Sequence, residues 1–477
     1  MNVLAIDQGT SSTKALVVDD GNRVVAECTV PVRTHALGNG AVEQDPAELL
    51  ESVIAAGRGA CDRAGQPVRA VGIANQGETV LRWDPATGDP LGPALSWQDT
   101  RASAITDELA DRAARLEEIT GLPLDPYFAA PKMTWLRRRD GDDGVVTTID
   151  VWINHRLTGR AVTDAATASR TLLLDLETVR WSEEALGYFA LDGAQPDVAG
   201  CAEPVGDTRA FGDSLPVTGL IVDQQAALFA ESCFGHGDAK CTYGTGAFLL
   251  ANAGRHAPRS RAGLAACVAW QLGDATTYCL DGQVYTAGAA VSWLQRLGLI
   301  DDASDLDRAM AAAGERAVFV PALAGLGAPD WAPHARAGWA GLSLASSRDD
   351  LVAAVVWGIA AQVARLGRAM AVDLGAPMAA LRVDGGLSRS AGLMQAQADL
   401  LQLPVERYPH ADATALGVAA LARIGAGAAS QADAVPDWTP EEVYEPRMSA
   451  DEAEEHLSRF AAASDALAGL ADAQGSA

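Results

Sequence analysis

The sequence predicts an α/β protein with at least two domains. Strand-like apolar runs alternate with helical runs along the chain, which is the pattern of layered α/β folds. The chain has 477 residues, more than one hydrophobic core usually serves. A strand–turn–strand passage near the N-terminus also returns in similar form near residue 240. Together these observations indicate a duplicated unit.

The first passage is a hairpin with a polar turn. NVLAID at 2–7 reads as a strand and KALVVDD at 14–20 as its partner. The turn between them holds Gly9, Thr10 and Ser11, and Lys14 follows. A core strand gains nothing from such a cluster, whereas a phosphate would be bound by backbone N–H groups, hydroxyls and an ammonium group. The turn is therefore a candidate phosphate site.

The second passage, KCTYGTGAFLLANAG at 240–254, has the same plan, and its tip is centred on Thr245. Two ordinary hairpins with flexible turns would explain the pattern as well. However, nothing structural requires threonine at both tips. If the tips face each other, their N–H groups and hydroxyls converge on one point.

Helix signals complete the outline. Asp45 and Pro46 start a helix over 45–65 as N-cap and first helical residue. A strand ending at Gly385 and Gly386 leads into a helix capped by Ser388 or Ser390, an arrangement suited to an anion or nucleotide. The patterns GxGxxG and GxxxxGK[ST] are absent, which disfavours a Rossmann dinucleotide site and excludes a P-loop. Residues 451–470 read as a terminal amphipathic helix.

The composition limits the partners and the compartment. A net charge of −26 argues against binding nucleic acid or an anionic membrane and favours a soluble cytoplasmic protein. Seven scattered cysteines without a CxxC pair indicate reduced packing residues rather than disulfides or a zinc site. No apolar run reaches the roughly 18 residues of a membrane span, and 351–361 reads as a core helix.

These passages resemble the FGGY family of carbohydrate kinases, most closely its glycerol kinases. The likeness covers about residues 1–430, with matching passages in the family's order: IDQGTSSTKALVVD, NQGET (75–79), LSWQDTRA (95–102), VDQQAALFAE (222–231), TYGTGAF (242–248), AGAAVSWL (287–294), VDGGLSRS (383–390) and TALGVAALA (414–422). The resemblance implies two actin-like, ribonuclease-H-like domains around a central cleft. The expected divisions are an acceptor and phosphate domain, an ATP-binding domain and a helical tail, at 1–231, 232–430 and 431–477.

The resemblance also implies a phosphoryl-transfer site that uses ATP and Mg²⁺. Asp223 matches the general base, and Asp7 matches a residue that holds Mg²⁺ through water, with Asp223 beside it. The first hairpin supplies Thr10, Ser11, Ser12 and Lys14 for the phosphates, and the second supplies Thr245 and Gly246. Positions flanking the nucleotide match Gly288, Ser292, Gly386 and Ser390, although Ser292 and Ser390 replace the glutamine and asparagine common in glycerol kinases.

The acceptor pocket is where the chain departs from glycerol kinases. The matching acceptor residues are Glu78, Trp97, Tyr127, Asp223, Gln224 and Phe248, a set of polar groups and flat apolar faces that suits a polyol. Gly77 stands where those kinases carry arginine. Losing such a charged donor typically costs about 1.5–3 kcal/mol. Glycerol, a longer polyol and a ketose therefore all remain candidate acceptors.

Two other classes of protein share this fold. A non-catalytic, nucleotide-dependent regulator would be expected to lose its general base, yet Asp7, Glu78 and Asp223 are all present. An actin- or chaperone-type ATPase would not need the three aromatic residues of the acceptor pocket. Because water must be kept from the γ-phosphate, a kinase of this plan benefits from domain closure, with a hinge expected near 225–240. The sequence leaves open whether the chain forms a homodimer.

Overall fold

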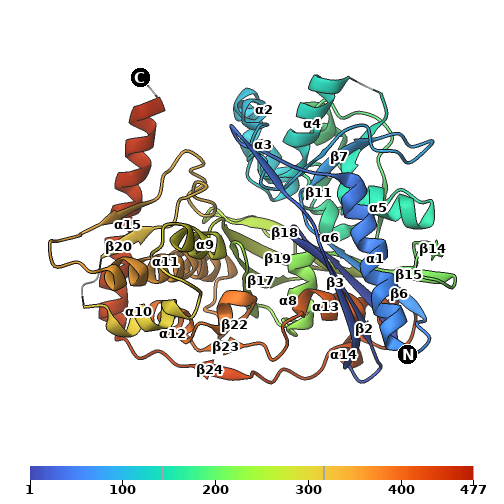
Figure 1. Ribbon diagram of the computed structural model, residues 1–477. Helices are drawn as coiled ribbons and strands as arrows, with labels where there is room; N and C mark the ends of the chain where they lie inside the picture. Colours follow the sequence, from blue (N-terminus) through green and yellow to red (C-terminus); the bar gives the residue numbers. More distant parts are fainter. Residues whose placement is uncertain (142, 315–316, 476–477) are drawn as a thin grey trace.

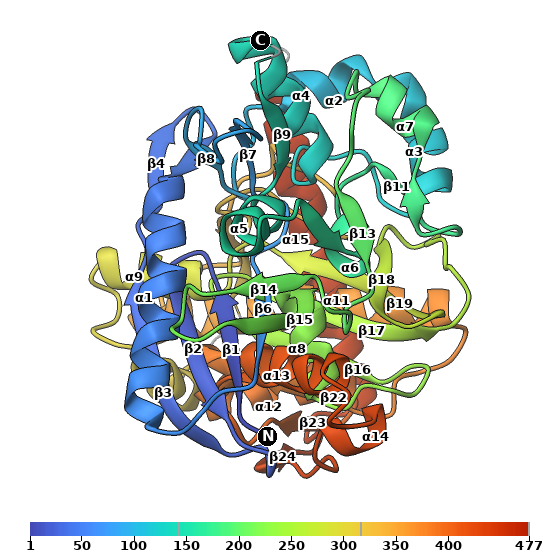
Figure 2. The same cartoon turned by 90° about the vertical axis from the view of Figure 1, so that its right-hand side faces the viewer.

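The computed structural model describes residues 1–141, 143–314 and 317–475. Two large mixed sheets, each flanked by helices, form two halves of the molecule (Figure 1). The N-terminal half runs from blue to green, and the C-terminal half from green to red. The quarter-turn view in Figure 2 shows the N-terminal sheet with helix α1 (Pro46–Ala64) on its outer side.

The N-terminal sheet has six strands in the order β14-β15-β6-β1-β2-β3. Helix α1 (Pro46–Ala64) covers it, and the Asp45 side chain accepts a hydrogen bond from the N–H of Ala47, so the predicted helix start is confirmed. The strands are β1 (Val3–Gln8), β2 (Ser12–Val18), β3 (Val24–Pro31), β6 (Ala70–Asn75), β14 (Gly206–Thr208) and β15 (Leu215–Val222).

The C-terminal sheet has seven strands in the order β18-β19-β17-β16-β22-β23-β24. Its strands are β16 (Ala239–Tyr243), β17 (Ala247–Gly254), β18 (Ala265–Leu272), β19 (Ala275–Val284), β22 (Leu381–Asp384), β23 (Val405–Arg407) and β24 (Glu442–Tyr444). Helix α11 (Arg348–Leu374) is long and apolar enough to cross a membrane, but 83% of its most apolar window is buried inside the protein. It is the core helix that the sequence predicts.

The two sheets are built around the same unit. Strand β1 pairs with β2 in an antiparallel hairpin and with β6 in parallel. Strand β16 likewise pairs with β17 in an antiparallel hairpin and with β22 in parallel. This shared topology confirms the duplication inferred from the two glycine–threonine turns.

Smaller elements complete both halves. The N-terminal half carries a five-stranded sheet of β4 (His35–Gly38), β5 (Ala41–Gln44), β8 (Ala94–Leu95), β7 (Val80–Trp83) and β9 (Val145–Thr148). Two strand pairs also lie there, β10 (Val162–Asp164) with β13 (Asp197–Ala199) and β11 (Leu174–Asp175) with β12 (Arg180–Trp181). Its further helices are α2 (Ser103–Glu108), α3 (Ala113–Thr120), α4 (Ala129–Asp140), α5 (Ile149–Thr158), α6 (Ala165–Ala168) and α7 (Glu183–Tyr188). Helix α8 (Asp223–Ala230) follows β15 at the end of the N-terminal half. The C-terminal half adds α9 (Gly288–Arg296), α10 (Asp305–Ala312), α12 (Ala391–Leu401), α13 (Ala413–Gly425), α14 (Gln431–Ala434), α15 (Ala450–Gly475), β20 (Val318–Val320) and β21 (Gly338–Ala340). Helix α15 confirms the predicted terminal helix.

Several contacts join the halves, including the packing of a helix and hydrogen bonds at the edge of a sheet. Helix α13 packs on strands β1, β6 and β15 of the N-terminal sheet, where a Cβ at Gly72 would lie only 2.6 Å from the Val418 carbonyl oxygen. On the other side, the edge strand β18 is bonded to the N-terminal half, where the Val268 N–H donates to the Ser169 hydroxyl at 3.0 Å. The chain passes between the halves through α8 and the segment before β16, and the hinge expected there stays a prediction.

Candidate active site

A cavity of about 180 Å³ lies between the two halves. It brings together residues from both hairpin tips, the start of α8 and the acceptor set. The predicted site residues that line it are Thr10, Ser11, Glu78, Trp97, Tyr127, Asp223, Gln224, Thr245 and Phe248, and the remaining wall comes from Gly77, Arg170, Val222, Thr242, Gly244 and Asp281. Groups suited to phosphate and groups suited to a polyol therefore share one space.

The first hairpin tip is fixed to its surroundings. The carbonyl oxygen of Thr10 accepts hydrogen bonds from the Gln44 amide at 2.9 Å and the Thr34 hydroxyl at 3.1 Å. Its hydroxyl accepts a bond from the Trp97 indole N–H at 2.9 Å. This tip is thus tied directly to an aromatic residue of the acceptor set.

The second tip is fixed differently, by the start of helix α9. The N–H groups of Ala287 and Ala289 both donate to the Thr245 carbonyl at 3.0 Å, and Gly288 N–H donates to the Gly244 carbonyl at 3.0 Å. A Cβ at Gly288 would lie 2.5 Å from that Gly244 oxygen, so only glycine permits the approach. Here the Thr245 side chain is left exposed.

Asp223 is the first residue of α8, directly after strand β15. Its Oδ1 accepts a hydrogen bond from the N–H of Gln224 at 2.7 Å. Burial, followed by the nearby charge of Glu78, raises the pKa of Asp223 to about 7, although Lys240 and Arg170 act in the opposite direction. A carboxylate with a pKa near neutrality suits general-base catalysis.

Asp7 lies among other carboxylates. Burial and the charges of Asp223, Asp412 and Asp384 raise its pKa to about 7, against the lowering effect of Lys14. Asp384 also has a buried Oδ1 without a hydrogen-bond partner among the described residues. Such an excess of hard oxygen donors fits Mg²⁺. Within the described ranges no three acidic, histidine or cysteine side chains lie close enough to bind a metal, so water and phosphate would complete its coordination.

Lys14 does not line the cavity, because its ammonium group pairs with Asp412 Oδ1 at 2.5 Å, just before α13. Partial burial disfavours its charge, but the hydrogen bond and charge of Asp412 outweigh that effect and raise the pKa of Lys14. A bound phosphate would have to compete with Asp412 for this cation.

The acceptor wall is aromatic. Trp97 meets Tyr127 and Phe248 edge-on, with ring centroids 6.0 Å apart in both pairs. Glu78 is held in a left-handed backbone conformation with φ of 53°, which is strained for a residue with a side chain. Lys240 donates to the Gln224 side-chain oxygen at 2.6 Å and so fixes the orientation of that amide. The wall is therefore preorganised.

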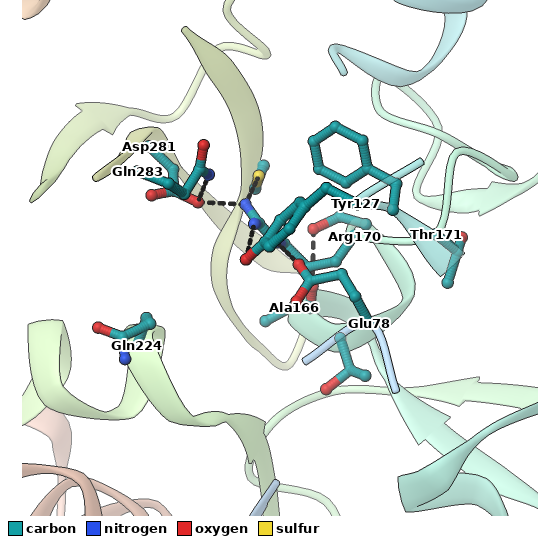
Figure 3. Close-up of polar contacts among 12 residues, drawn as sticks. Glu78, Tyr127, Ala166, Arg170, Thr171, Gln224, Asp281 and Gln283 are labelled. Carbon is teal, nitrogen blue, oxygen red and sulfur yellow. Dashed lines mark hydrogen bonds and ion pairs between the residues drawn. The ribbon is translucent and has the colours of Figure 1, made fainter. Parts of the chain in front are cut away.

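Sequence reasoning missed two site residues, Arg170 and Asp281. Arg170 Nε donates to Glu78 Oε1 at 2.5 Å, and its Nη1 pairs with Asp281 (Figure 3). The only sequence signal was a lone arginine in the apolar run ATASRTLLL.

The predicted nucleotide residues lie apart from the cavity. Ser390 caps α12 by accepting from Leu393 N–H at 3.2 Å, and its hydroxyl bonds Asp307 at 2.6 Å. Ser292 is exposed on α9. Gly386 lines a second cavity of about 710 Å³ with Tyr408 and other residues. The remaining predicted phosphate residues, Ser12 and Gly246, are in strand β2 and in the second turn.

Comparisons with known proteins agree with this arrangement. The N-terminal and C-terminal domain models of the FGGY family of carbohydrate kinases match residues 2–230 and 239–426. Glycerol kinase of Myxococcus xanthus is 40% identical, covering 96% of this chain and 97% of its own, and that of Thermus brockianus is 40% identical, covering 94% of each.

Solved structures of the same kind confirm the two-domain, actin-like fold. Glycerol kinase of Plasmodium falciparum with ADP has a TM-score of 0.89 at 30% identity and covers 98% of both chains. A xylulose kinase from Brucella ovis has a TM-score of 0.88 at 26% identity and covers 98% of this chain and all of its own. The chain therefore belongs to the FGGY family of carbohydrate kinases.

Proposed function

We propose that this kinase transfers the γ-phosphoryl group of ATP to a hydroxyl of a small polyol, with Asp223 as the general base. The observation that supports this most is the shared cavity. Thr10 and Thr245, from the two duplicated hairpins, line the same space as Asp223, and Glu78 with its aromatic neighbours completes the wall. Donor and acceptor groups can therefore meet in line there.

Each residue has a distinct task in this reaction. The Asp223 carboxylate accepts the hydroxyl proton as the oxygen–phosphorus bond forms and the bond to ADP breaks. Backbone N–H groups and hydroxyls of both tips, together with Lys14, stabilise the charge on the phosphate oxygens. Mg²⁺, when bound with ATP, would neutralise the β- and γ-phosphates, and Asp7 and Asp223 would hold it through water. Gly288, Ser292, Gly386 and Ser390 would flank the nucleotide.

We favour a glycerol-like acceptor. The relatives that share 40% of the sequence are named glycerol kinases. Gly77 lacks the arginine of those enzymes, but Arg170 brings a guanidinium to Glu78 from another part of the chain. A Cβ at Gly77 would lie 3.1 Å from Val222 Cγ2, so the absent side chain leaves only limited room. A ketose is the second candidate, because the Brucella ovis neighbour is a xylulose kinase.

The test is ADP release from Mg-ATP in the presence of C3 to C6 polyols and ketoses. We expect one small polyol to raise release at least tenfold above the hydrolysis seen without an acceptor. Stimulation by a ketose alone would replace the polyol assignment. No stimulation by any acceptor would contradict the kinase proposal and favour the regulator. We also propose a cytoplasmic location, which is compatible with the seven free cysteines. Whether the protein forms a homodimer would be tested by sedimentation.

A further inference from the structure

One buried guanidinium joins carboxylates from both halves of the molecule. Arg170 follows α6 in the N-terminal half and has a side chain that is only 5% exposed. It pairs with Glu78 of its own half and with Asp281 of strand β19, and it also bonds the Cys267 sulfur of β18 at 3.0 Å. Figure 3 shows the guanidinium between these partners. Its contacts therefore cross the domain interface beside the cavity.

Asp281 has one satisfied oxygen and one free oxygen. Its Oδ2 accepts from Arg170 and from the Gln283 amide at 2.7 Å. Its Oδ1 is buried and has no hydrogen-bond partner among the described residues, although the residue lines the cavity. An unpaired carboxylate oxygen in a buried position is unfavourable unless a ligand satisfies it. Because Asp281 lines the cavity, its unused Oδ1 is the acceptor that this residue can offer to a ligand in the proposed polyol pocket.

We propose that Asp281 is a second polyol-binding carboxylate, supplied by the C-terminal half, and that Arg170 is the residue that positions it opposite Glu78. The inference rests on the proposed function and deepens it. Arg170 occupies one oxygen of each carboxylate and leaves one oxygen of each to accept from a hydroxyl. Because a guanidinium is planar and rigid, it holds these two acceptors at a constant spacing.

The two carboxylates, Glu78 and Asp281, predict which phosphoryl acceptors fit the pocket. When one hydroxyl is presented to Asp223, a polyol must offer two further hydroxyls, one to Glu78 and one to Asp281. An acceptor with adjacent hydroxyls beyond the reacting one meets this requirement. A diol that lacks the internal hydroxyls leaves one carboxylate without a partner, and binding is then weaker because that buried group stays unsatisfied.

The test measures binding by calorimetry in the full-length protein. The probes are glycerol and ribitol, each paired with a diol that lacks the internal hydroxyls, 1,3-propanediol or 1,5-pentanediol. We expect the unmodified protein to bind at least one polyol tenfold or more tightly than its paired diol. Asp281→Ala should weaken that polyol at least tenfold, leave the diol within twofold and so remove the discrimination. Equal losses for polyol and diol, or no discrimination in the unmodified protein, would overturn the proposal.

Variants of Arg170 separate positioning from folding. Arg170→Met should weaken polyol binding at least as much as Asp281→Ala, and Arg170→Lys should restore part of it, while the Kd for ADP stays within twofold. Asp281→Asn, which keeps the size of the side chain, serves if the alanine variant does not fold. Arg423→Met is the matched control, because Arg423 is 3% exposed but bonds the Asp19 and Ala434 carbonyls. Arg423→Met should change neither the affinity for the polyol nor the affinity for ADP. A parallel loss of ADP affinity in the Arg170 variants would contradict a positioning role.

Failure of the proposed function and failure of the inference about Asp281 would give different results in these experiments. A protein that binds the polyol but releases no ADP would contradict the proposed function, yet the Asp281 variants would still be informative. A protein that phosphorylates the polyol and keeps its affinity in Asp281→Ala would overturn the present inference alone.

Discussion

The two hairpins have the same strand pairing but different chemical surroundings. The tip of β1–β2 is bound through Thr10 to Trp97 of the acceptor wall and is followed by Lys14. The tip of β16–β17 is bound through its carbonyls to the start of α9, and the lysine of this hairpin, Lys240, donates to the Gln224 side chain. The duplicated hairpins therefore share one backbone arrangement, whereas the neighbouring elements give each tip different contacts.

Under the proposed function, this difference gives each tip a different role. The first hairpin would connect the phosphates with the acceptor, because its threonine hydroxyl accepts a hydrogen bond from the Trp97 indole. The second hairpin would connect the phosphates with α9 and the nucleotide. Variants of the two tips should therefore affect different kinetic constants.

Asp223 should give the largest effect, since it is the proposed general base in the cavity that residues of both tips line. Asp223→Asn keeps the shape of the side chain but cannot accept a proton. We expect kcat to fall about 10²-fold or more, with ATP still bound. Initial rates and a nucleotide-binding titration check this. Near-full turnover in the variant would remove Asp223 from its role.

Each hairpin carries one lysine: Lys14 in β2 pairs with Asp412, whereas Lys240 in β16 donates to the side chains of Gln224 and Thr242. Lys14→Met should lower kcat/KM for ATP about 10–100-fold, the usual loss for a charged hydrogen bond of about 1.5–3 kcal/mol. Asp412→Asn releases the same cation and should cost much less. If both variants lose activity equally, the ion pair rather than the phosphate contact explains the effect.

Gly288 tests the anchor of the second hairpin. In Gly288→Ala the new Cβ would lie 2.5 Å from the Gly244 oxygen, so the tip must shift. KM for ATP should rise about tenfold, equivalent to roughly 1.4 kcal/mol, while KM for the polyol is unchanged. Gly187→Ala in α7, where nothing lies within 4 Å, is the matched control. A rise in KM for the polyol would show that the two tips are not separated as described.

The pH dependence of activity tests the two carboxyl groups with raised pKa values, Asp7 and Asp223. The pKa values of Asp7 and Asp223 are both raised to about 7, so the required carboxylates become protonated as the pH falls through this value. kcat/KM should therefore decline below about pH 7 at limiting Mg²⁺ and subsaturating polyol, and saturating Mg²⁺ should move the decline to lower pH because a bound cation lowers the pKa of nearby carboxylates. An activity that stays level down to pH 5 at limiting Mg²⁺ would contradict a buried general base.

The free energy of unfolding should depend on pH in the opposite direction from activity. A carboxyl whose pKa is raised on folding binds its proton more tightly in the native state, so its effect on the free energy of unfolding becomes less favourable as pH rises from about 4 to 7. Asp223→Asn should raise the melting temperature at pH 8 by about 1–3 °C and have less effect at pH 5. A lower melting temperature at pH 8 would indicate that the carboxylate is stabilised in the fold.

The sequence was informative where the structure is local. Each hairpin consists of adjacent strands joined by a short turn, so Thr10 and Thr245 could be recognised from a few residues. The start of α1 at Asp45 was equally local. The actin-like fold, by contrast, followed from resemblance.

Long-range contacts could not be predicted in this way. Arg170 and Asp281 are 111 residues apart, and only the packing of β18 and β19 against the N-terminal half brings them together. The docking of α13 on the N-terminal sheet depends on the absence of a side chain at Gly72, whose close approach to Val418 no spacing reveals. The pairing of Lys14 with Asp412 follows from that docking.

The most direct test of the central claim is a double-mutant cycle on the two tips. The kcat/KM for ATP is measured in Thr10→Val, Thr245→Val and the double variant. If both hydroxyls act on one triphosphate in the same cavity, their effects should be coupled by about 0.5–3 kcal/mol. Strict additivity of the two losses would contradict a shared site between the hairpins.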